Sequence, residues 1–196
     1  MSIKSTNYII YKMNFILETN RLLLRNLQES DLDDFLFYRS NPEITQYQNF
    51  DTYNKKQAEE FILSQKKRRF GIEAQWIQLA IILKSDAESD NKLIGDCAVK
   101  LQEDTAEIGC TISHQFQKKG YAKEVLLMLM KYLFEERNIR RIVENTAEEN
   151  IASQKLLDSL GFRKEGHFVE NVFSKGRLWN ELQYAMLKRE WDLLKK

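Results

Sequence analysis

The strongest constraint in the sequence is a strand pattern that is followed almost directly by a helix pattern, between residues 106 and 134. Apolar and polar residues alternate over 106–113, as is typical of a strand with one buried face. After a short polar turn, apolar residues recur at three- and four-residue spacing, which predicts one buried helix face: Ala122, Val125, Leu126, Leu129, Met130, Leu133 and Phe134. The helix is therefore expected to pack on the sheet that contains the strand.

Comparable patterns extend along the rest of the chain. They predict a strand over 15–27, two helices over 30–40 and 54–69, and three strands over 75–84, 91–102 and 106–113. The helix described above, over 121–134, is followed by a strand over 139–146, a helix over 149–162 and two strands within 162–191. The last two strands share a turn around Lys175–Gly176. This order predicts an α/β (mixed α+β) fold, a mixed sheet with helices packed on it, and not a strict βαβ alternation.

Several residues predict where the helices begin and end. Ser30 or Asp31 is a suitable N-cap for the first helix, and Asn150 for the last. Pro42, the sole proline, separates the first two helices. Gly161 stands where the last helix would stop.

Length and composition predict one domain with a sizeable core. The chain has 196 residues, of which 43% are hydrophobic and 30% charged. We expect a single domain over 15–196, with residues 1–14 as an N-terminal extension and Met13 as an alternative start. The formal net charge of +1 offers no overall attraction for nucleic acid or a membrane surface. No apolar stretch approaches the roughly 18 residues of a membrane span, and no signal peptide is recognisable, so a cytoplasmic location is expected.

Cysteine and histidine usage argues against a metal site. Cys97 and Cys110 lie inside apolar strand segments without metal-ligand spacing, and we expect two reduced core thiols. His114 and His167 are too few and too far apart to suggest a metal centre.

The turn before the central helix carries charge and a glycine. In "QKKGYA", residues 117–122, successive backbone N–H groups precede or begin a helix and have no partner within it. The helix dipole, two lysines and a glycine without a Cβ would together suit a pyrophosphate. Taken alone, the turn is also compatible with an ordinary loop. It lacks both the GxxxxGK[ST] and the GxGxxG spacing, which argues against ATP and NAD.

Three ordered segments resolve this choice: "AEIGCTISHQFQKKGYAKEVL", "ENIASQKLLDSLGFRKEG" and "WNELQYAML". Together they resemble the GNAT superfamily of acyl-CoA N-acyltransferases, and 117–122 matches the family's Q/R-x-x-G-x-G/A loop. "TNRLLLRNLQESDLDDF" resembles the ribosomal-protein alanine N-acetyltransferase-like (RimJ/RimL-type) branch, which also holds antibiotic and polyamine acetyltransferases. The resemblance covers about 17–191.

The resemblance implies a mostly antiparallel sheet with two splayed central strands, 106–113 and 139–146, flanking helices, and acyl-CoA wedged between those strands. No metal is implied. The implied cofactor contacts are backbone groups of Ile112 and Ser113 for the pantetheine arm, the loop for the pyrophosphate (Gln117, Lys118, Lys119, Gly120, Tyr121 and Ala122), and Asn150 and Ser153 from the following helix.

Acyl transfer to an amine needs a base for the amine proton and a proton or stabilising contact for the leaving thiolate. Glu107, on the strand face opposite Ile108, is the first choice of base, although it could equally be a solvated strand residue. Glu144 is the second. A backbone N–H of the splayed strand would serve the oxyanion.

The expected thiolate partner differs from the family pattern. Many members carry a tyrosine in N-x-x-A-x-x-x-Y, and here that position is Leu157. Ser153 is the nearest hydroxyl in the matched motif and takes the role of proton donor. Both Ser153 and Asn150 could instead serve only the start of the helix.

These residues predict an acetyl-CoA-dependent N-acetyltransferase that works by direct attack in a ternary complex, because Cys110 has no adjacent base for covalent catalysis. The acceptor is a protein N-terminus or a small amine such as a polyamine or aminoglycoside. A non-catalytic acyl-CoA-binding module is the alternative, and a homodimer is left open. Four aromatic residues either line an acceptor pocket or belong to the core: Tyr47, Tyr53, Trp179 and Tyr184.

Overall fold

The computed structural model describes residues 15–85 and 91–195, so the predicted extension over 1–14 lies outside the described residues. Within this part, eight strands form one sheet. The strands are β1 (Ile16–Glu18), β2 (Leu22–Asn26), β3 (Ile77–Leu83), β4 (Lys92–Gln102), β5 (Thr105–Ile112), β6 (Arg141–Ala147), β7 (Arg163–Ser174) and β8 (Arg177–Leu187).

The α-helices lie between and after these strands. They are α1 (Leu32–Arg39), α2 (Pro42–Thr45), α3 (Lys55–Lys66), α4 (Tyr121–Lys131), α5 (Ile151–Ser159) and α6 (Lys188–Leu194). Two short 3-10 helices, η1 (Glu29–Asp31) and η3 (His114–Phe116), precede α1 and α4, and a π-helical turn, η4 (Tyr132–Glu136), extends α4.

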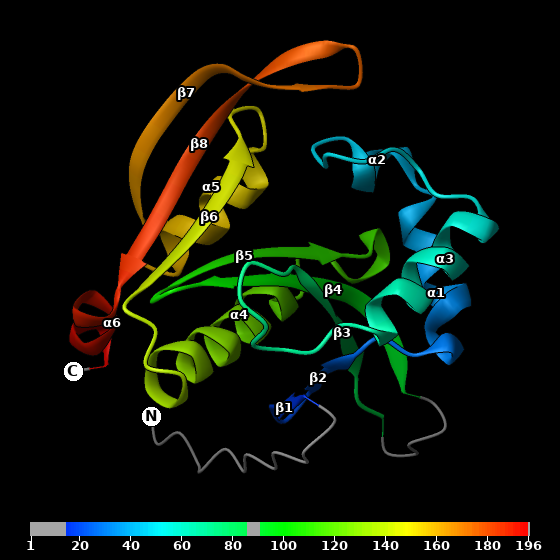
Figure 1. Cartoon of the computed structure of the whole chain (residues 1–196), viewed down its shortest axis with the longest axis horizontal. Helices are drawn as coiled ribbons and strands as arrows, with labels where there is room; N and C mark the ends of the chain where they lie inside the picture. The colour runs from blue at the N-terminus through cyan, green and yellow to red at the C-terminus, as the bar shows by residue number, and fades with distance from the viewer. Residues whose placement is uncertain (1–14, 86–90, 196) are drawn as a thin grey trace.

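The strand order across the sheet is β1-β2-β3-β4-β5-β6-β8-β7. Every neighbouring pair is antiparallel except β5 and β6, which are parallel. The predicted mixed, mostly antiparallel sheet is therefore confirmed. Figure 1 shows that β6, β7 and β8 rise away from β1–β5, so the two halves of the sheet open like a V.

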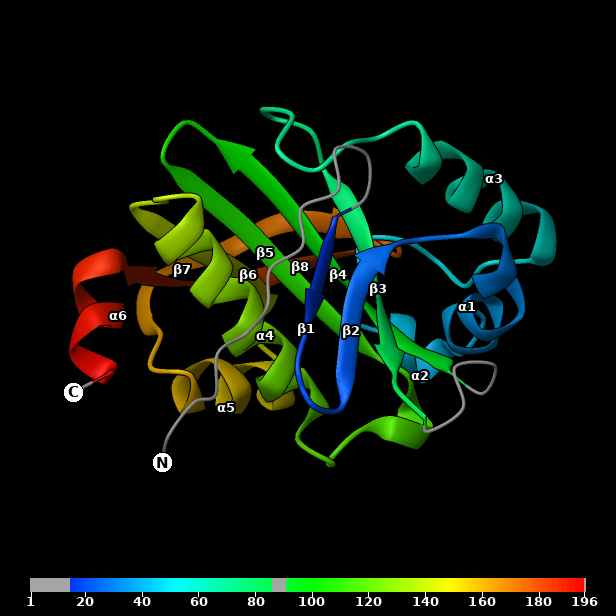
Figure 2. The same cartoon turned by 90° about the horizontal axis from the view of Figure 1, so that it is seen from below.

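Helices cover both faces of the larger half. The apolar stripe of α4 is buried, with Val125, Leu126 and Leu129 completely inaccessible, and it packs against β1, β2 and β5. On the other face, α1 and α3 enclose a second apolar cluster around Phe35 and Ile62. Figure 2 shows α4 lying across the middle of the sheet, with α1 and α3 to one side. The predicted packing of the central helix is confirmed.

The helix boundaries follow local chemistry. Asn150 is the N-cap of α5, and its side chain accepts the Ser153 N–H at 3.1 Å. Pro42 separates α1 from α3 but itself begins α2, a short helix that was not predicted and in whose first turn its missing N–H leaves no bond unmade. Asp31 precedes α1 without capping it, because its carboxylate accepts the Gln28 N–H at 2.8 Å and pairs with Arg25.

Two sequence-based expectations about the elements are wrong. The single strand predicted over 15–27 is a hairpin, because Thr19 turns the chain: its N–H donates to Leu22 O at 2.8 Å and its Oγ1 accepts the Leu22 N–H. The last strand ends at Leu187 and does not run on to the tryptophan of α6. Glu190 accepts the Leu187 N–H at 2.8 Å, and this contact starts α6.

Candidate functional site

The opening between β5 and β6 arises from an unusually short pairing. Their register holds only three pairs, Thr105↔Arg141, Ala106↔Ile142 and Glu107↔Val143. Beyond this point β5 stays paired with β4 as far as Ile112, while β6 stays paired with β8 as far as Ala147. Each strand thus follows its outer neighbour, and the two diverge (Figure 1).

The divergence exposes one edge of β5. The Ser113 N–H donates to Ile94 O on the β4 side at 2.8 Å. Because backbone groups alternate in direction along an antiparallel strand, Cys110 and Ile112 direct theirs toward the opening. The expectation for Ile112 agrees with this arrangement. The Ser113 N–H belongs to the sheet and its carbonyl accepts the Phe116 N–H, so these contacts lend no support to a cofactor bond from the Ser113 backbone, which stays a prediction.

The loop before α4 presents a run of free donors. Gly120 is the N-cap of α4 with φ 82°, and Lys118 also has a positive φ of 60°. Within the part of the chain that the structure describes, no acceptor contacts the backbone N–H groups of Lys118, Lys119, Gly120, Tyr121 or Ala122. A turn of this kind at a helix N-terminus is a concave anion site.

Gln117 ties this loop to the opening. Its side-chain amide donates to Ile112 O at 3.1 Å, and its backbone N–H donates to His114 O at 3.4 Å. The predicted loop residues, Gln117 to Ala122, are therefore brought together at the end of β5, next to the exposed strand edge.

Arg21 contacts this loop, and the sequence analysis did not predict that contact. Arg21, in the β1–β2 turn, forms an ion pair with Glu124 of the first turn of α4, and its Nη1 donates to Lys119 O at 3.4 Å. Its guanidinium also lies 4.7 Å from the centre of the Tyr121 ring. About 100 residues separate Arg21 from these partners, so no spacing in the sequence signals the contact.

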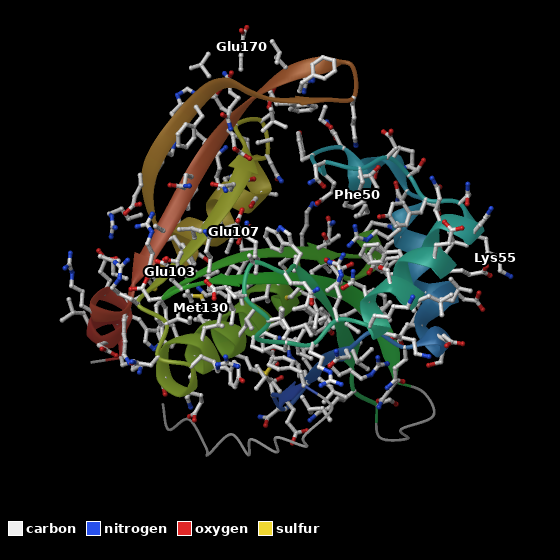
Figure 3. All side chains as sticks on the ribbon, in the orientation of Figure 1. Phe50, Lys55, Glu103, Glu107, Met130 and Glu170 are labelled. Atoms are coloured by element: carbon white, nitrogen blue, oxygen red, sulfur yellow. The ribbon has the colours of Figure 1, made fainter. Side chains whose placement is uncertain are left out.

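Glu107 is the last residue of β5 that pairs with β6, and its side chain is one-quarter exposed. Its carboxylate lies 2.6 Å from Lys100 Nζ and accepts a hydrogen bond from Asn145 Nδ2 at 3.1 Å. Asn145 in turn accepts from Gln183 Nε2 at 3.2 Å. This polar row crosses four strands on the face away from α4, and Figure 3 marks Glu107 near the point where the halves of the sheet part.

Glu144 points to the opposite face and has a different environment. It is 6% exposed, and one carboxylate oxygen contacts Ser153 Oγ at 3.4 Å. The other, Oε2, is buried without a partner among the described residues. Burial raises the pKa of Glu144 to about 8, and the Ser153 hydrogen bond offsets this only in part. Leu157, at the position of the family tyrosine, is fully buried core.

Two buried side-chain oxygens lack partners in the described part, and both lie in segments that border the opening: Glu144 Oε2 on β6 and Ser113 Oγ directly after β5. Buried polar atoms are normally satisfied. Their position, one on each of the segments that border the opening, fits a site that completes its hydrogen bonds with a polar ligand.

The four aromatic residues are not brought together. Tyr184 is 1% exposed in the core, and Tyr53 packs with Phe35 and Phe61. Tyr47, after α2, meets Trp179 of β8 edge-to-face at 6.0 Å. Only this last pair bridges the two halves of the molecule.

The two cysteines face each other across β4 and β5 as free thiols. A hydrogen bond with Cys97, together with burial, raises the pKa of the Cys110 thiol well above its usual value. Cys110 is therefore not a ready nucleophile, and Cys97 is fully buried, in agreement with the expectation of core thiols. In the described ranges no group of His, Cys, Asp and Glu side chains has the arrangement of a metal site.

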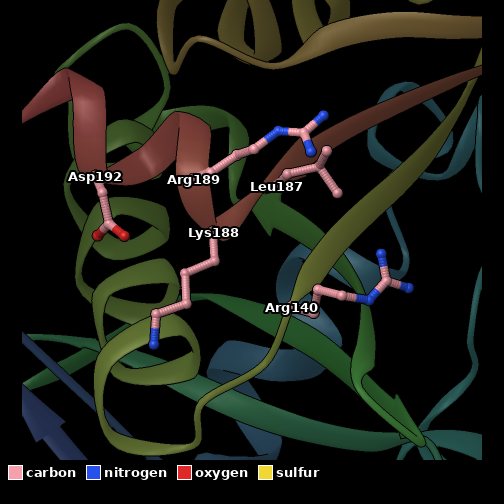
Figure 4. A pocket seen from close by; sticks show the side chains of 5 residues that line it. All are labelled: Arg140, Leu187, Lys188, Arg189 and Asp192. Atoms are coloured by element: carbon pink, nitrogen blue, oxygen red, sulfur yellow. The ribbon is translucent and has the colours of Figure 1, made fainter.

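A pocket of about 360 Å³ lies elsewhere, where β8 meets α6. Figure 4 shows its lining, which is mostly basic: Arg140, Leu187, Lys188, Arg189 and Asp192. Arg140 is paired with Asp104, and Lys188 Nζ donates to Asn138 at 2.7 Å. The pocket thus lies at the closed end of the strands and contributes nothing to the opening.

None of the helices among the described residues is long and apolar enough to cross a membrane.

Comparison with known proteins agrees with this geometry. A family model described as an acetyltransferase (GNAT) domain matches residues 21–163. The uncharacterized N-acetyltransferase p20 of Bacillus licheniformis is 35% identical over 179 residues, covering 89% of this chain and 97% of that protein. The crystal structure of a GNAT-family acetyltransferase from Bacillus anthracis has a TM-score of 0.78 and 25% identity, covering 89% of this chain and 99% of that one.

The fold is also that of the spermidine N-acetyltransferase of Vibrio cholerae, solved in complex with CoA and spermine. Its TM-score is 0.72 at 24% identity, and the match covers 88% of this chain and 99% of that one. The predicted fold, with its splayed central strands, is confirmed.

The buried carboxyl of Glu144 should make stability depend on pH. The folded protein keeps its proton up to about pH 8, whereas the unfolded chain releases it near 4.5. The free energy of unfolding therefore falls as the pH rises between these values. Thermal unfolding of Glu144→Gln should show a gain in Tm over the wild type that is larger at about pH 8 than at about pH 5.

The matched control for this measurement is Glu149→Gln, a change at an exposed residue in the turn after β6. It should leave the difference in Tm between the two pH values unaltered. An equal effect of Glu144→Gln at both pH values would contradict the assignment of a proton to the folded state.

Proposed function

Because the chain belongs to the GNAT family of acetyltransferases, we propose that it transfers the acetyl group of acetyl-CoA to a primary amine by direct attack in a ternary complex. The observation that carries the proposal is the run of unpartnered N–H groups over 118–122, beside the exposed edge of β5. A pyrophosphate and a pantetheine arm need these two features next to each other.

The loop would hold the diphosphate of acetyl-CoA. Five N–H groups, the dipole of an eleven-residue helix and the charges of Lys118 and Lys119 act in the same direction. Arg21 neutralises Glu124, which would otherwise place a negative charge in the first turn of the helix. The pantetheine amides would pair with the backbone of Cys110 and Ile112, as a missing strand would.

Glu107 would take the proton of the amine. It faces the side of the sheet away from α4, so an acceptor that enters there would not compete with the cofactor for space. An ammonium group can replace Lys100 beside the carboxylate, since the two carry the same charge. Asn145 keeps the carboxylate oriented during this exchange.

Ser153 would serve the departing thiolate. Asn150 fixes the first turn of α5 by capping it, which accounts for Asn150 without a direct cofactor contact. Ser153 Oγ then points to Glu144 on β6, within the opening that the pantetheine arm would enter. Leu157 has no hydroxyl proton to donate, so the hydroxyl of Ser153 is the group of the matched motif that can donate a proton to the thiolate.

The acceptor class remains a protein N-terminus or a small amine. The V. cholerae neighbour, named a spermidine N-acetyltransferase, favours a polyamine as the first small amine to try. Glu181 on β8, which shares the face of Asn145 and Gln183, adds a negative charge that would suit a cationic acceptor.

The role of the loop is tested by isothermal titration of CoA against Lys118→Ala/Lys119→Ala. Removal of two exposed charges should raise Kd about tenfold, or about 1.4 kcal/mol, and the loss should shrink at high salt. The control is Lys55→Ala/Lys56→Ala, which removes two lysines from the start of α3 on the far side of the molecule (Figure 3). Equal affinities of both variants at low salt would argue against phosphate contacts.

The activity itself is tested by release of free thiol from acetyl-CoA in the presence of an amine panel. The panel contains spermidine, an aminoglycoside and peptides with free N-termini, each matched with its N-acetylated form. At least one free amine should release CoA thiol while its acetylated form does not. Tight CoA binding without thiol release for any amine would favour a non-catalytic binding module.

The base is tested with Glu107→Gln. The variant should lower kcat about a hundredfold, because general base catalysis contributes on that order, with the Kd of acetyl-CoA unchanged. Glu103→Gln, at the β4–β5 turn (Figure 3), is the matched control and should keep full activity. Turnover by Glu107→Gln that equals the wild type across the pH range would remove Glu107 from the mechanism.

A further inference from the structure

Glu144 is a buried acid that the proposed mechanism does not yet use. It lies on β6 one residue beyond Val143, which makes the last pair with β5. It therefore stands at the narrow end of the opening, on the face that α5 covers. A carboxyl group is seldom buried to this extent without a cation, so its retention there calls for a chemical reason.

The contacts of Glu144 leave it with one hydrogen bond. Ser153 Oγ lies 3.4 Å from Oε1, and Oε2 has no partner among the described residues. A carboxylate in this position would bury a charge with little to stabilise it, so the neutral acid is the favoured form. In agreement with this, burial raises the pKa of Glu144 to about 8. Near neutral pH the group therefore holds a proton that it can donate.

The groups that face Glu144 do not change its charge state. Tyr184 stands opposite on β8, with Lys164 Nζ 5.9 Å from the centre of its ring. The β5 and β4 strands contribute the neutral thiols of Cys110 and Cys97, and α5 contributes Ser153. No ion pair involves Glu144 in the part of the chain that is described.

We propose that Glu144 is a positioning residue that acts through Ser153, and that it replaces the proton which Ser153 gives to the thiolate of coenzyme A. This inference rests on the proposed function. As the amine nitrogen bonds to the acetyl carbon, the carbon–sulfur bond breaks and its electron pair goes to sulfur. The Ser153 hydroxyl proton passes to sulfur, and the Glu144 proton passes to Ser153 Oγ. The amine proton leaves to Glu107.

The cycle closes when CoA leaves as the thiol, Glu107 releases the amine proton to solvent and the Glu144 carboxylate takes a proton from solvent. A serine hydroxyl alone is a poor proton donor, and a neutral carboxyl behind it makes the transfer favourable. Ser153 on α5, with Glu144 on β6 behind it, thereby supplies the proton that a tyrosine cannot supply here, because Leu157 occupies that position as buried core.

The opposite assignment, Glu144 as the amine base, fits the geometry less well. A base must be unprotonated when the amine arrives, and the environment of Glu144 favours the proton. The side chain also shares its face with the α5 helix, whereas Glu107 faces the other side of the sheet. A required acid makes kcat fall at high pH, whereas a required base makes kcat fall at low pH. The same pH profile of kcat therefore separates the two roles.

The test is kcat against pH for the wild type, Glu144→Gln, Ser153→Ala and the double variant, with saturating acetyl-CoA and the best amine of the panel. Wild-type kcat should fall above about pH 8. Glu144→Gln should lower kcat at least tenfold near pH 7, abolish the fall above pH 8 and leave the KM of acetyl-CoA unchanged. In the Ser153→Ala background, Glu144→Gln should have no further effect, since the two act in series.

Glu149→Gln is the control and should keep the wild-type profile. CoA titration and thermal unfolding of each variant show whether the fold and the cofactor site are retained. If Glu144→Gln binds CoA and keeps wild-type kcat and pH dependence, the inference is overturned while the proposed function stands. If Glu144→Gln instead removes the fall in kcat at low pH, Glu144 is the base. If Glu144→Gln lowers kcat as much in the Ser153→Ala background as in the wild type, the relay is overturned. If no amine releases thiol with the wild type, the proposed function fails first.

Discussion

The pairing between β5 and β6 is the constraint on which the rest of the structure depends. It spans only three residue pairs, and among the described strands it is the one parallel strand pairing. Each strand is held more extensively on its other side, β5 by eight pairs with β4 and β6 by seven with β8. The sheet can therefore open at this seam without losing its core, and beyond Glu107 it leaves an edge of β5 that is not paired with β6.

The loop at the end of this seam presents its N–H groups in a fixed place only if the start of α4 is held in place. The buried stripe of α4 anchors the helix on the sheet, and the ion pair of Arg21 with Glu124 fixes its first turn to the β1–β2 hairpin. Gln117 links the loop back to Ile112. The free N–H groups thus keep a constant position relative to the exposed edge of β5, which is what recognition of an extended two-part cofactor requires.

Two glutamates on either side of the seam acquire different chemistry from their surroundings. Glu107 is partly exposed and contacts Lys100 and Asn145, whereas Glu144 is buried with Ser153 as its single partner. The Glu107 carboxylate thus has a charged and a polar partner on one face of the sheet, whereas burial on the other face raises the pKa of the Glu144 carboxyl to about 8. Leu157 offers no hydroxyl on α5, and of the two serines of this helix Ser153 is the one that contacts the buried acid.

By itself, the sequence determined the order of nearly all elements, the buried face of α4 and the loop at its start, because periodicity and capping residues act within a few positions of the chain. It placed the β1–β2 turn and α6 wrongly, where single side-chain bonds from Thr19 and Glu190 decide the outcome. Only the tertiary structure decided where β5 and β6 part, that Arg21 reaches α4, and that Glu144 is buried while Glu107 is not. These depend on strand register and on contacts between distant segments, and burial together with different partners distinguishes two glutamates that look alike in the sequence.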